Sequence, residues 1–153
     1  MTTPSSPEQE LKRFVAKFEP GHQSLIRAAR KLLRQRFPTA NELVYDNYNF
    51  FVIGYSPTER PSDTIVSLAA GANGLSLCFI RGATLPDPQR ILLGSGNQTR
   101  FIRLDSAEVL TRREVQTLLG AAVAHAKAPL PVPGRGKLII RSVSAKQRPR
   151  RKP

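Results

Sequence analysis

The chain has 153 residues, of which 40% are hydrophobic and 23% charged, a composition typical of one globular domain and not of a disordered or collagen-like protein. Its 24 lysines and arginines outnumber its 11 aspartates and glutamates and give a formal net charge of +13 at pH 7, a surplus that favours anionic partners or surfaces. One cysteine and two histidines exclude an intrachain disulfide and a Cys-rich or His-rich metal site.

Two helices are predicted at the start of the chain. Ser6, Pro7 and Gln9 are typical of a helix start, with Ser6 as N-cap, Pro7 at the first helical position and Gln9 completing a capping box. A second helix is expected from about residue 22 to residue 36 and ends before Pro38. One face of this helix is basic and carries Arg27, Arg30, Lys31 and Arg34.

The middle of the chain is predicted to be β-structure. The runs rich in aromatic and β-branched residues are ELVYD (42–46), YNFFVIGY (48–55), TIVSLAA (64–70), GLSLCFI (74–80) and QTRFIRL (98–104). Because only residues 71–73 separate the third run from the fourth, these two runs should form a hairpin. A helix follows, opened by Thr111 and Glu114 as a second capping box. A proline-rich linker then leads to a last strand, KLIIRSV (137–143), at the edge of the sheet.

Strands in series with helices at both ends predict an α+β fold, in which a mainly antiparallel sheet carries the N-terminal helices and the later helix on one face. We expect one domain over residues 6–144, a flexible N-terminus at 1–5 and a basic disordered tail at 145–153. The end of this tail, KQRPRRKP, has no apolar residue, so it cannot bury enough surface to offset the entropy of ordering. The start of the sequence does not resemble a signal peptide and no apolar run approaches a membrane span, so a cytoplasmic protein without membrane contact is expected.

Three runs carry a family resemblance: ELVYDNYNFFVIGYSPTERPSDTIVSL, IRGATLPDPQRILLGSGNQTRFIRL and KLIIRSVSAKQRPRR. Over roughly residues 40–150 they resemble the YdhG-like family of uncharacterised bacterial domains. This resemblance implies an architecture similar to that of frataxin, and some members of the family are regarded as frataxin-like iron chaperones. An iron surface of that kind would be an acidic ridge on the first helix, but here Glu8, Glu10 and Glu19 are interspersed with lysine and arginine. We therefore expect no metal site and no cofactor.

The sequence contains none of the strong catalytic motifs. G-x-S-x-G, H-E-x-x-H and the P-loop are all missing. Cys78 lies within an apolar strand, which is more typical of a small buried hydrophobic residue than of a nucleophile. A binding protein is therefore expected, and not an enzyme.

Polar connections between the apolar strands are the main candidate for a ligand site. The residues expected to contact a small polar or anionic ligand are Tyr45, Asn47, Asn49, Arg60, Arg81, Asp87, Gly94, Gly96 and Arg100. They offer guanidinium, amide and phenol groups, and the two glycines allow backbone N–H groups to turn toward an anion. The hypothesis requires that the connections at 46–49, 58–63, 81–87 and 94–100 converge. The alternative is that these groups bind one another, for example Arg81 with Asp87.

The basic tail and the basic second helix favour a second function, non-specific nucleic-acid binding. The tail residues expected to contact nucleic acid are Lys146, Arg148, Arg150, Arg151 and Lys152. Such residues neutralise phosphates whatever the base sequence. However, the tyrosines at 45, 48 and 55 are distant from this cluster in the sequence, and no RNP or KH signature occurs. A solvated, solubilising end is the third interpretation of the tail.

Overall fold

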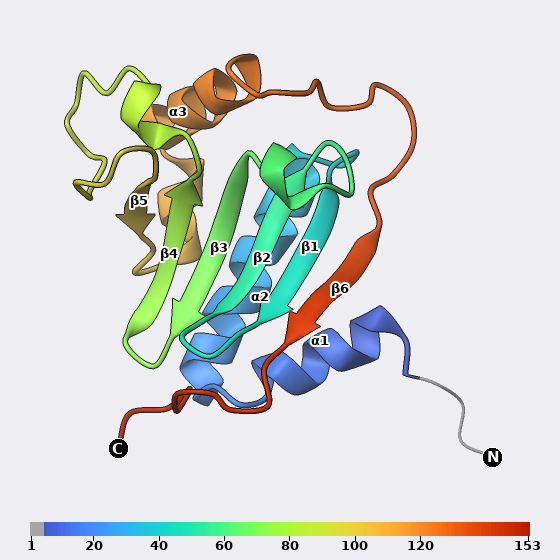
Figure 1. The fold of residues 1–153 in the computed structure, drawn as a ribbon. Coiled ribbons are helices and arrows are strands. Elements are labelled where there is room, and N and C mark those ends of the chain that lie inside the picture. The colour runs from blue at the N-terminus through green and yellow to red at the C-terminus, as the bar shows by residue number, and fades with distance from the viewer. Residues whose placement is uncertain (1–4) are drawn as a thin grey trace.

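The structure is a computed structural model and describes residues 5–153. The flexible N-terminus predicted at residues 1–5 therefore lies, apart from Ser5, outside the described residues. The helices are α1 (Pro7–Val15), α2 (Pro20–Arg36) and α3 (Arg113–Ala124). The strands are β1 (Asn41–Asp46), β2 (Phe51–Ser56), β3 (Val66–Gly71), β4 (Gly74–Phe79), β5 (Arg100–Arg103) and β6 (Leu138–Val143) (Figure 1).

The six strands form a single sheet in the order β5-β4-β3-β2-β1-β6. Neighbouring strands from β1 to β5 pair antiparallel, whereas β6 pairs parallel with β1. The predicted α+β class and the mainly antiparallel sheet are thus confirmed. The predicted hairpin of β3 and β4 is also present, and the pairing of Gly71 with Gly74 leaves a two-residue turn between the strands. The last strand returns to a sheet edge, as its sequence predicts.

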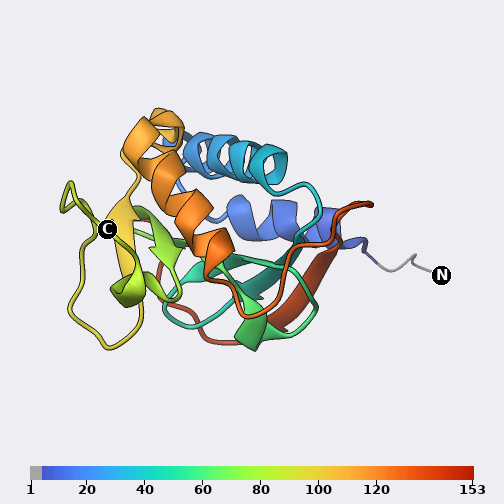
Figure 2. The same ribbon diagram turned by 90° about the horizontal axis from the view of Figure 1, so that it is seen from above.

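The helices cover one face of the sheet and leave the other face free of helices (Figure 2). Strand β4 shows how the sequence produces this division, because alternate side chains of a strand point to opposite faces. Leu75, Leu77 and Phe79 are buried in the core, whereas Ser76 and Cys78 are half-buried on the other face. Full burial of one large apolar side chain stabilises the fold by about 1.5–3 kcal/mol. This pattern therefore fixes which face the helices cover.

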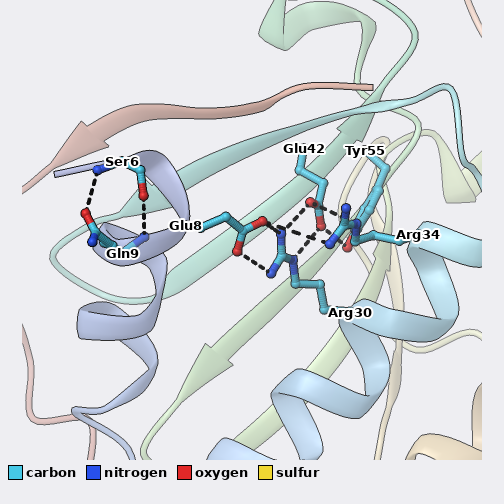
Figure 3. A network of polar contacts seen from close by, with 7 residues as sticks. All are labelled: Ser6, Glu8, Gln9, Arg30, Arg34, Glu42 and Tyr55. Atoms are coloured by element: carbon cyan, nitrogen blue, oxygen red, sulfur yellow. Dashed lines mark hydrogen bonds and ion pairs between the residues drawn. The ribbon is translucent and has the colours of Figure 1, made fainter. Parts of the chain in front are cut away.

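The start of α1 forms as predicted, whereas the start of α3 does not. The hydroxyl of Ser6 accepts the backbone N–H of Gln9 at 3.2 Å, and the Gln9 side chain accepts the Ser6 N–H at 2.9 Å (Figure 3). The capping box predicted at Thr111 and Glu114 is wrong. Residues 107–111 form a 3-10 turn, in which the Thr111 hydroxyl donates back to the carbonyl oxygen of Glu108. This local bond competes with the capping role.

The composition predicts a disordered tail at 145–153, but the structure shows these residues packed against the end of the sheet. Arg150 is only 5% exposed, and its Nη2 donates to the Asp46 carboxylate at 2.9 Å and to the carbonyl oxygen of Asn47 at 2.6 Å. The backbone N–H of Arg148 donates to the carbonyl oxygen of Tyr48 at 2.8 Å. The prediction of disorder weighed only apolar burial. The segment is instead held by backbone hydrogen bonds and by the bonds of the charged Arg150 side chain, and the latter are stronger than ordinary neutral ones.

Candidate nucleic-acid interface

The four polar connections do not converge on one pocket. The turn at 46–49 joins the end of β1 to the start of β2, whereas the connections that follow β2 and β4 lie at the opposite end of the sheet (Figure 1). When antiparallel strands follow one another in chain order, successive connections alternate between the two ends. The predicted single site is therefore wrong: Tyr45, Asn47 and Asn49 are separated from the predicted residues of the other three connections.

Arg81 and Asp87, at the far end of the sheet, have separate structural partners. The Asp87 carboxylate accepts the backbone N–H groups of Ile91 and Leu92, each at 3.0 Å, and so closes its own loop. Arg81 donates from Nη1 to the carbonyl oxygen of His125 at 3.3 Å. His125 is the C-cap of α3, where a cation stabilises the unpaired carbonyl groups of a helix end. Both residues thus serve the fold, although not as the pair that the sequence suggests.

The other predicted residues at this end are engaged by their own loops. Arg100 donates to the carbonyl oxygens of Gly96 and Thr99, so the glycine segment 94–96 offers carbonyl oxygen to a guanidinium. An anion-binding nest would require N–H groups there. In the preceding loop, the backbone N–H of Arg60 donates to the Thr58 hydroxyl at 3.0 Å. The contacts of Arg100 match the alternative in which the loops satisfy their own polar groups. At Arg60 only the backbone is engaged in this way, and the Asp63 carboxylate accepts the Thr58 hydroxyl at 2.7 Å.

A cavity of about 100 Å³ remains at this end, lined among others by Arg81, Gln98, His125 and Lys127. It has room for about three water molecules at the volume that water occupies in the liquid. Pockets for small organic ligands usually measure about 300–1,000 Å³. The cavity is therefore too small for the predicted metabolite-sized ligand.

A groove of about 800 Å³ lies on the sheet face that the helices leave uncovered, and we call it the sheet-face groove. Small residues of β3 and β4 and of the turn between them form its floor. Its walls are Asn49 and Phe50 from the β1–β2 connection, Phe101 and Arg103 from β5, and C-terminal residues between 148 and 153. Two predicted ligand-site residues thus lie beside the predicted nucleic-acid-binding segment: Asn49 lines the groove with it, and the Asn47 carbonyl oxygen accepts from Arg150.

Exposed aromatic rings lie beside the sheet-face groove in the connection between β1 and β2. Tyr48 is 50% exposed and Phe50 is 51% exposed. Gly71 makes room beside them, because a Cβ at this position would lie 3.2 Å from ring carbons of Phe50, a tight contact. Glycine therefore lets the Phe50 ring lie against strand β3 without displacing it.

Cations lie over the aromatic rings on both sides of the groove. The Arg148 guanidinium is 5.7 Å from the centre of the Tyr48 ring, and the Arg103 guanidinium is 5.9 Å from the centre of the Phe101 ring. Both distances are within the range of cation–π attraction. Tyr48 and Arg148 are remote in the sequence, whereas Phe101 and Arg103 are two residues apart on β5. Sequence reasoning missed the arrangement because no local spacing brings Arg148 to Tyr48, and it overlooked the Phe101–Arg103 pair.

The charge of the sheet-face groove is uniformly positive. Its basic lining residues are Arg103, Arg148, Arg151 and Lys152, and none of the lining residues that the structure describes is aspartate or glutamate. Two predicted nucleic-acid-binding residues stand apart from this set. Arg150 is buried in its pair with Asp46, and Lys146 is exposed but does not line the groove.

Asp46 anchors the C-terminal wall of the groove. Its carboxylate is fully buried and accepts Lys17 Nζ at 2.7 Å and Arg150 Nη2 at 2.9 Å. Burial alone would raise the pKa of Asp46, but hydrogen bonds involving Lys17, Gln147 and Arg150 outweigh burial and lower the pKa. The carboxylate is therefore charged at neutral pH and holds the segment that contains Arg150 beside the β1–β2 connection.

The iron that the family resemblance implies does not fit the acidic residues of α1. The Glu8 carboxylate accepts two hydrogen bonds from Arg30, at 2.7 and 3.1 Å, and Glu10 lies 4.0 Å from Arg13. Among residues 5–153, no three histidine, cysteine, aspartate or glutamate side chains are grouped so that they could hold a metal ion. Glu8 and Glu10 are instead paired with arginine, and Glu19 lies apart from them as the N-cap of α2.

Comparison of the chain with models of known protein families, with curated protein sequences and with solved structures found no match. The YdhG-like resemblance therefore stays an interpretation of three runs of the sequence. None of the helices that the structure describes is long and apolar enough to cross a membrane.

Proposed function

We propose that the protein binds single-stranded nucleic acid in the sheet-face groove. The observation that carries this proposal is a groove that combines the exposed ring of Phe50 and the half-buried ring of Phe101 with four basic residues and has no acidic residue among its described lining. Proteins that bind single strands combine a positively charged groove, which follows the phosphates, with aromatic side chains on which bases stack. Arg103, Arg148, Arg151 and Lys152 would contact phosphates.

Phe50 is the best-placed stacking platform. It is half exposed and lines the groove directly, whereas Tyr48 stands beside it under the Arg148 guanidinium. Stacking of a base on an aromatic ring contributes about 1–3 kcal/mol. Paired bases in a duplex are already stacked and do not present their faces. The groove should therefore prefer single strands, with little preference for base sequence.

The number of phosphates contacted can be measured from the salt dependence. If the four basic lining residues each neutralise one phosphate, the slope of log K against log salt is about −2.8 for a single strand, at about −0.7 per phosphate. Loss of one contacting cation reduces the magnitude of that slope by about 0.7.

Fluorescence anisotropy with a labelled oligo(dT) of about 12 nucleotides, within the usual site sizes, tests the proposal. Phe50→Ala should weaken binding about tenfold, since tenfold corresponds to about 1.4 kcal/mol. Arg148→Gln should weaken binding and reduce the salt slope. Val132→Ala and Arg113→Gln are matched controls, because both residues are exposed and neither lines the groove. Wild-type affinity in both groove variants would refute the proposal.

A further inference from the structure

A second basic groove, of about 620 Å³, lies between α2 and residues 134–136, on the side of the molecule that carries the helices. We call it the α2 groove. Four exposed basic residues line it: Arg27, Lys31 and Arg34 on α2, and Arg135 on the opposite wall. It shares no lining residue with the sheet-face groove, so it does not depend on the function proposed above.

One carboxylate, that of Glu42, lines the α2 groove, and both it and the neighbouring Glu8 are already bound by arginine. Arg30 binds Glu42 at 2.9 and 3.0 Å and Glu8 at 2.7 and 3.1 Å, and the Tyr55 hydroxyl also donates to Glu42 at 2.9 Å (Figure 3). Arg34 reaches the same two carboxylates only at 3.7 and 3.9 Å, outside the usual length of a hydrogen bond. The network therefore hydrogen-bonds its carboxylates to Arg30 and holds Arg34 in two longer ion pairs. Among the residues that the structure describes, no ion pair is formed by Arg27, Lys31 or Arg135.

The spacing of the bases on α2 is unfavourable without an anion. Arg27, Lys31 and Arg34 are separated by four and then three residues, so they are neighbours on one stripe of the helix. Like charges at these separations repel and destabilise the helix. An anion bound along the stripe would turn this repulsion into attraction.

Two glycines place Arg135 opposite that stripe. Gly134 has a φ of +98°, a backbone conformation that favours glycine. A Cβ on Gly136 would lie only 1.6 Å from the carbonyl oxygen of Ala40, so the chain can pass the start of β1 only with glycine there. The backbone N–H of Gly136 donates to the carbonyl oxygen of Pro38 at 3.0 Å. Arg135 is thus held by backbone geometry on both sides.

We infer that the α2 groove binds a ligand that carries two or more phosphate groups. Arginine binds phosphate oxygens through paired N–H groups, and lysine adds a point charge. Seven residues separate Arg27 from Arg34, about 10 Å along a helix axis, so one phosphate cannot contact the whole stripe. Phe37, the one aromatic among the described lining residues, is buried, so recognition relies on charge and not on stacking.

Titration calorimetry with tripolyphosphate at low salt tests this inference. Lys31→Gln and Arg135→Gln should each weaken binding about tenfold, and inorganic monophosphate should bind the wild type at least about tenfold more weakly than tripolyphosphate. Arg113→Gln removes one exposed charge elsewhere and should leave the affinity unchanged. Melting temperatures of all three variants verify that each is folded. Wild-type affinity in both groove variants, or an equal loss in Arg113→Gln, would overturn the inference.

Oligo(dT) binding by the same variants distinguishes the source of the phosphates. If Lys31→Gln and Arg135→Gln also weaken oligo(dT) binding about tenfold, the α2 groove takes the phosphodiester backbone of nucleic acid. If both variants bind oligo(dT) as the wild type does, the groove takes a small oligophosphate. Arg148→Gln should weaken oligo(dT) binding and leave tripolyphosphate binding unchanged. The proposals for the two grooves can therefore be refuted independently of each other.

Discussion

The pair of Arg150 with Asp46 should control whether residues 145–153 stay docked against the sheet. Arg150→Ala removes both of the hydrogen bonds that its Nη2 donates, to the Asp46 carboxylate and to the carbonyl oxygen of Asn47. We expect this segment to detach while the rest of the domain stays folded, because the core contains no residue from it.

The expected magnitude follows from two opposing contributions. Each hydrogen bond from a charged donor contributes about 1.5–3 kcal/mol. Against this, Nε and Nη1 of Arg150 are buried without a partner in the structure, at a cost of about 1–3 kcal/mol for each unsatisfied group. Together the two bonds contribute about 3–6 kcal/mol. Because the docked state forms, we take the cost of the two unsatisfied groups at the low end, about 2 kcal/mol in total. This leaves about 1–4 kcal/mol for docking, which corresponds to an opening constant that rises about 5- to 700-fold in Arg150→Ala.

Hydrogen exchange of the Arg148 amide measures this opening, because that N–H donates to the carbonyl oxygen of Tyr48 in the docked state. Its exchange should accelerate about 5- to 700-fold in Arg150→Ala, whereas the amide of Ile53, in the central strand β2, should keep its protection. Lys146→Ala is the matched control, since Lys146 is an exposed base in the same segment. Unchanged exchange at Arg148 in Arg150→Ala would refute the reasoning.

Three further predictions concern acidity, the buried ion pair and iron. Folding lowers the pKa of Asp46, so its contribution to stability is present above the unfolded pKa of about 3.9 and is lost as the pH falls through the folded value. Arg148 amide exchange, corrected for its intrinsic pH dependence, should therefore rise only below about pH 4. Glu42→Gln should lower the free energy of unfolding in urea by about 3 kcal/mol, since it breaks a buried pair, whereas Glu10→Gln should change it by less than about 0.5 kcal/mol. Fe(II) should bind no more tightly than millimolar, or about 4 kcal/mol, and stoichiometric micromolar binding in calorimetry would contradict this.

Features set by neighbouring residues could be predicted from the sequence. The Ser6 capping box, the β3–β4 hairpin and the edge strand β6 all follow from patterns within a few residues. Alternation of apolar and small residues in β4 likewise separates the core face from the open face. Local propensity and hydrophobic period are sufficient for such elements.

The candidate site depends on contacts that no local pattern contains. Asp46 and Arg150 are 104 residues apart, and Arg148 reaches Tyr48 over a similar separation. The composition of the C-terminal segment predicts disorder because residues 146–153 contain no apolar side chain, but the charged and backbone contacts of the segment hold it in place. The prediction that the four strand-end loops converge was wrong for a different reason. The order of the predicted strands was sufficient to exclude it, because successive connections of an antiparallel sheet alternate between its two ends and so separate the 46–49 turn from the others.

The central claim is that the sheet-face groove recognises unstacked bases as well as phosphates. The most direct measurement is the ratio of affinities for an oligo(dT) and for a duplex of equal length, in the wild type and in Phe50→Ala at one salt concentration. The account predicts that the wild type binds the single strand about tenfold more tightly, and that Phe50→Ala loses most of this preference, since one stacked base contributes about 1–3 kcal/mol. Equal affinity of the wild type for both forms, or an unchanged ratio in Phe50→Ala, would contradict it.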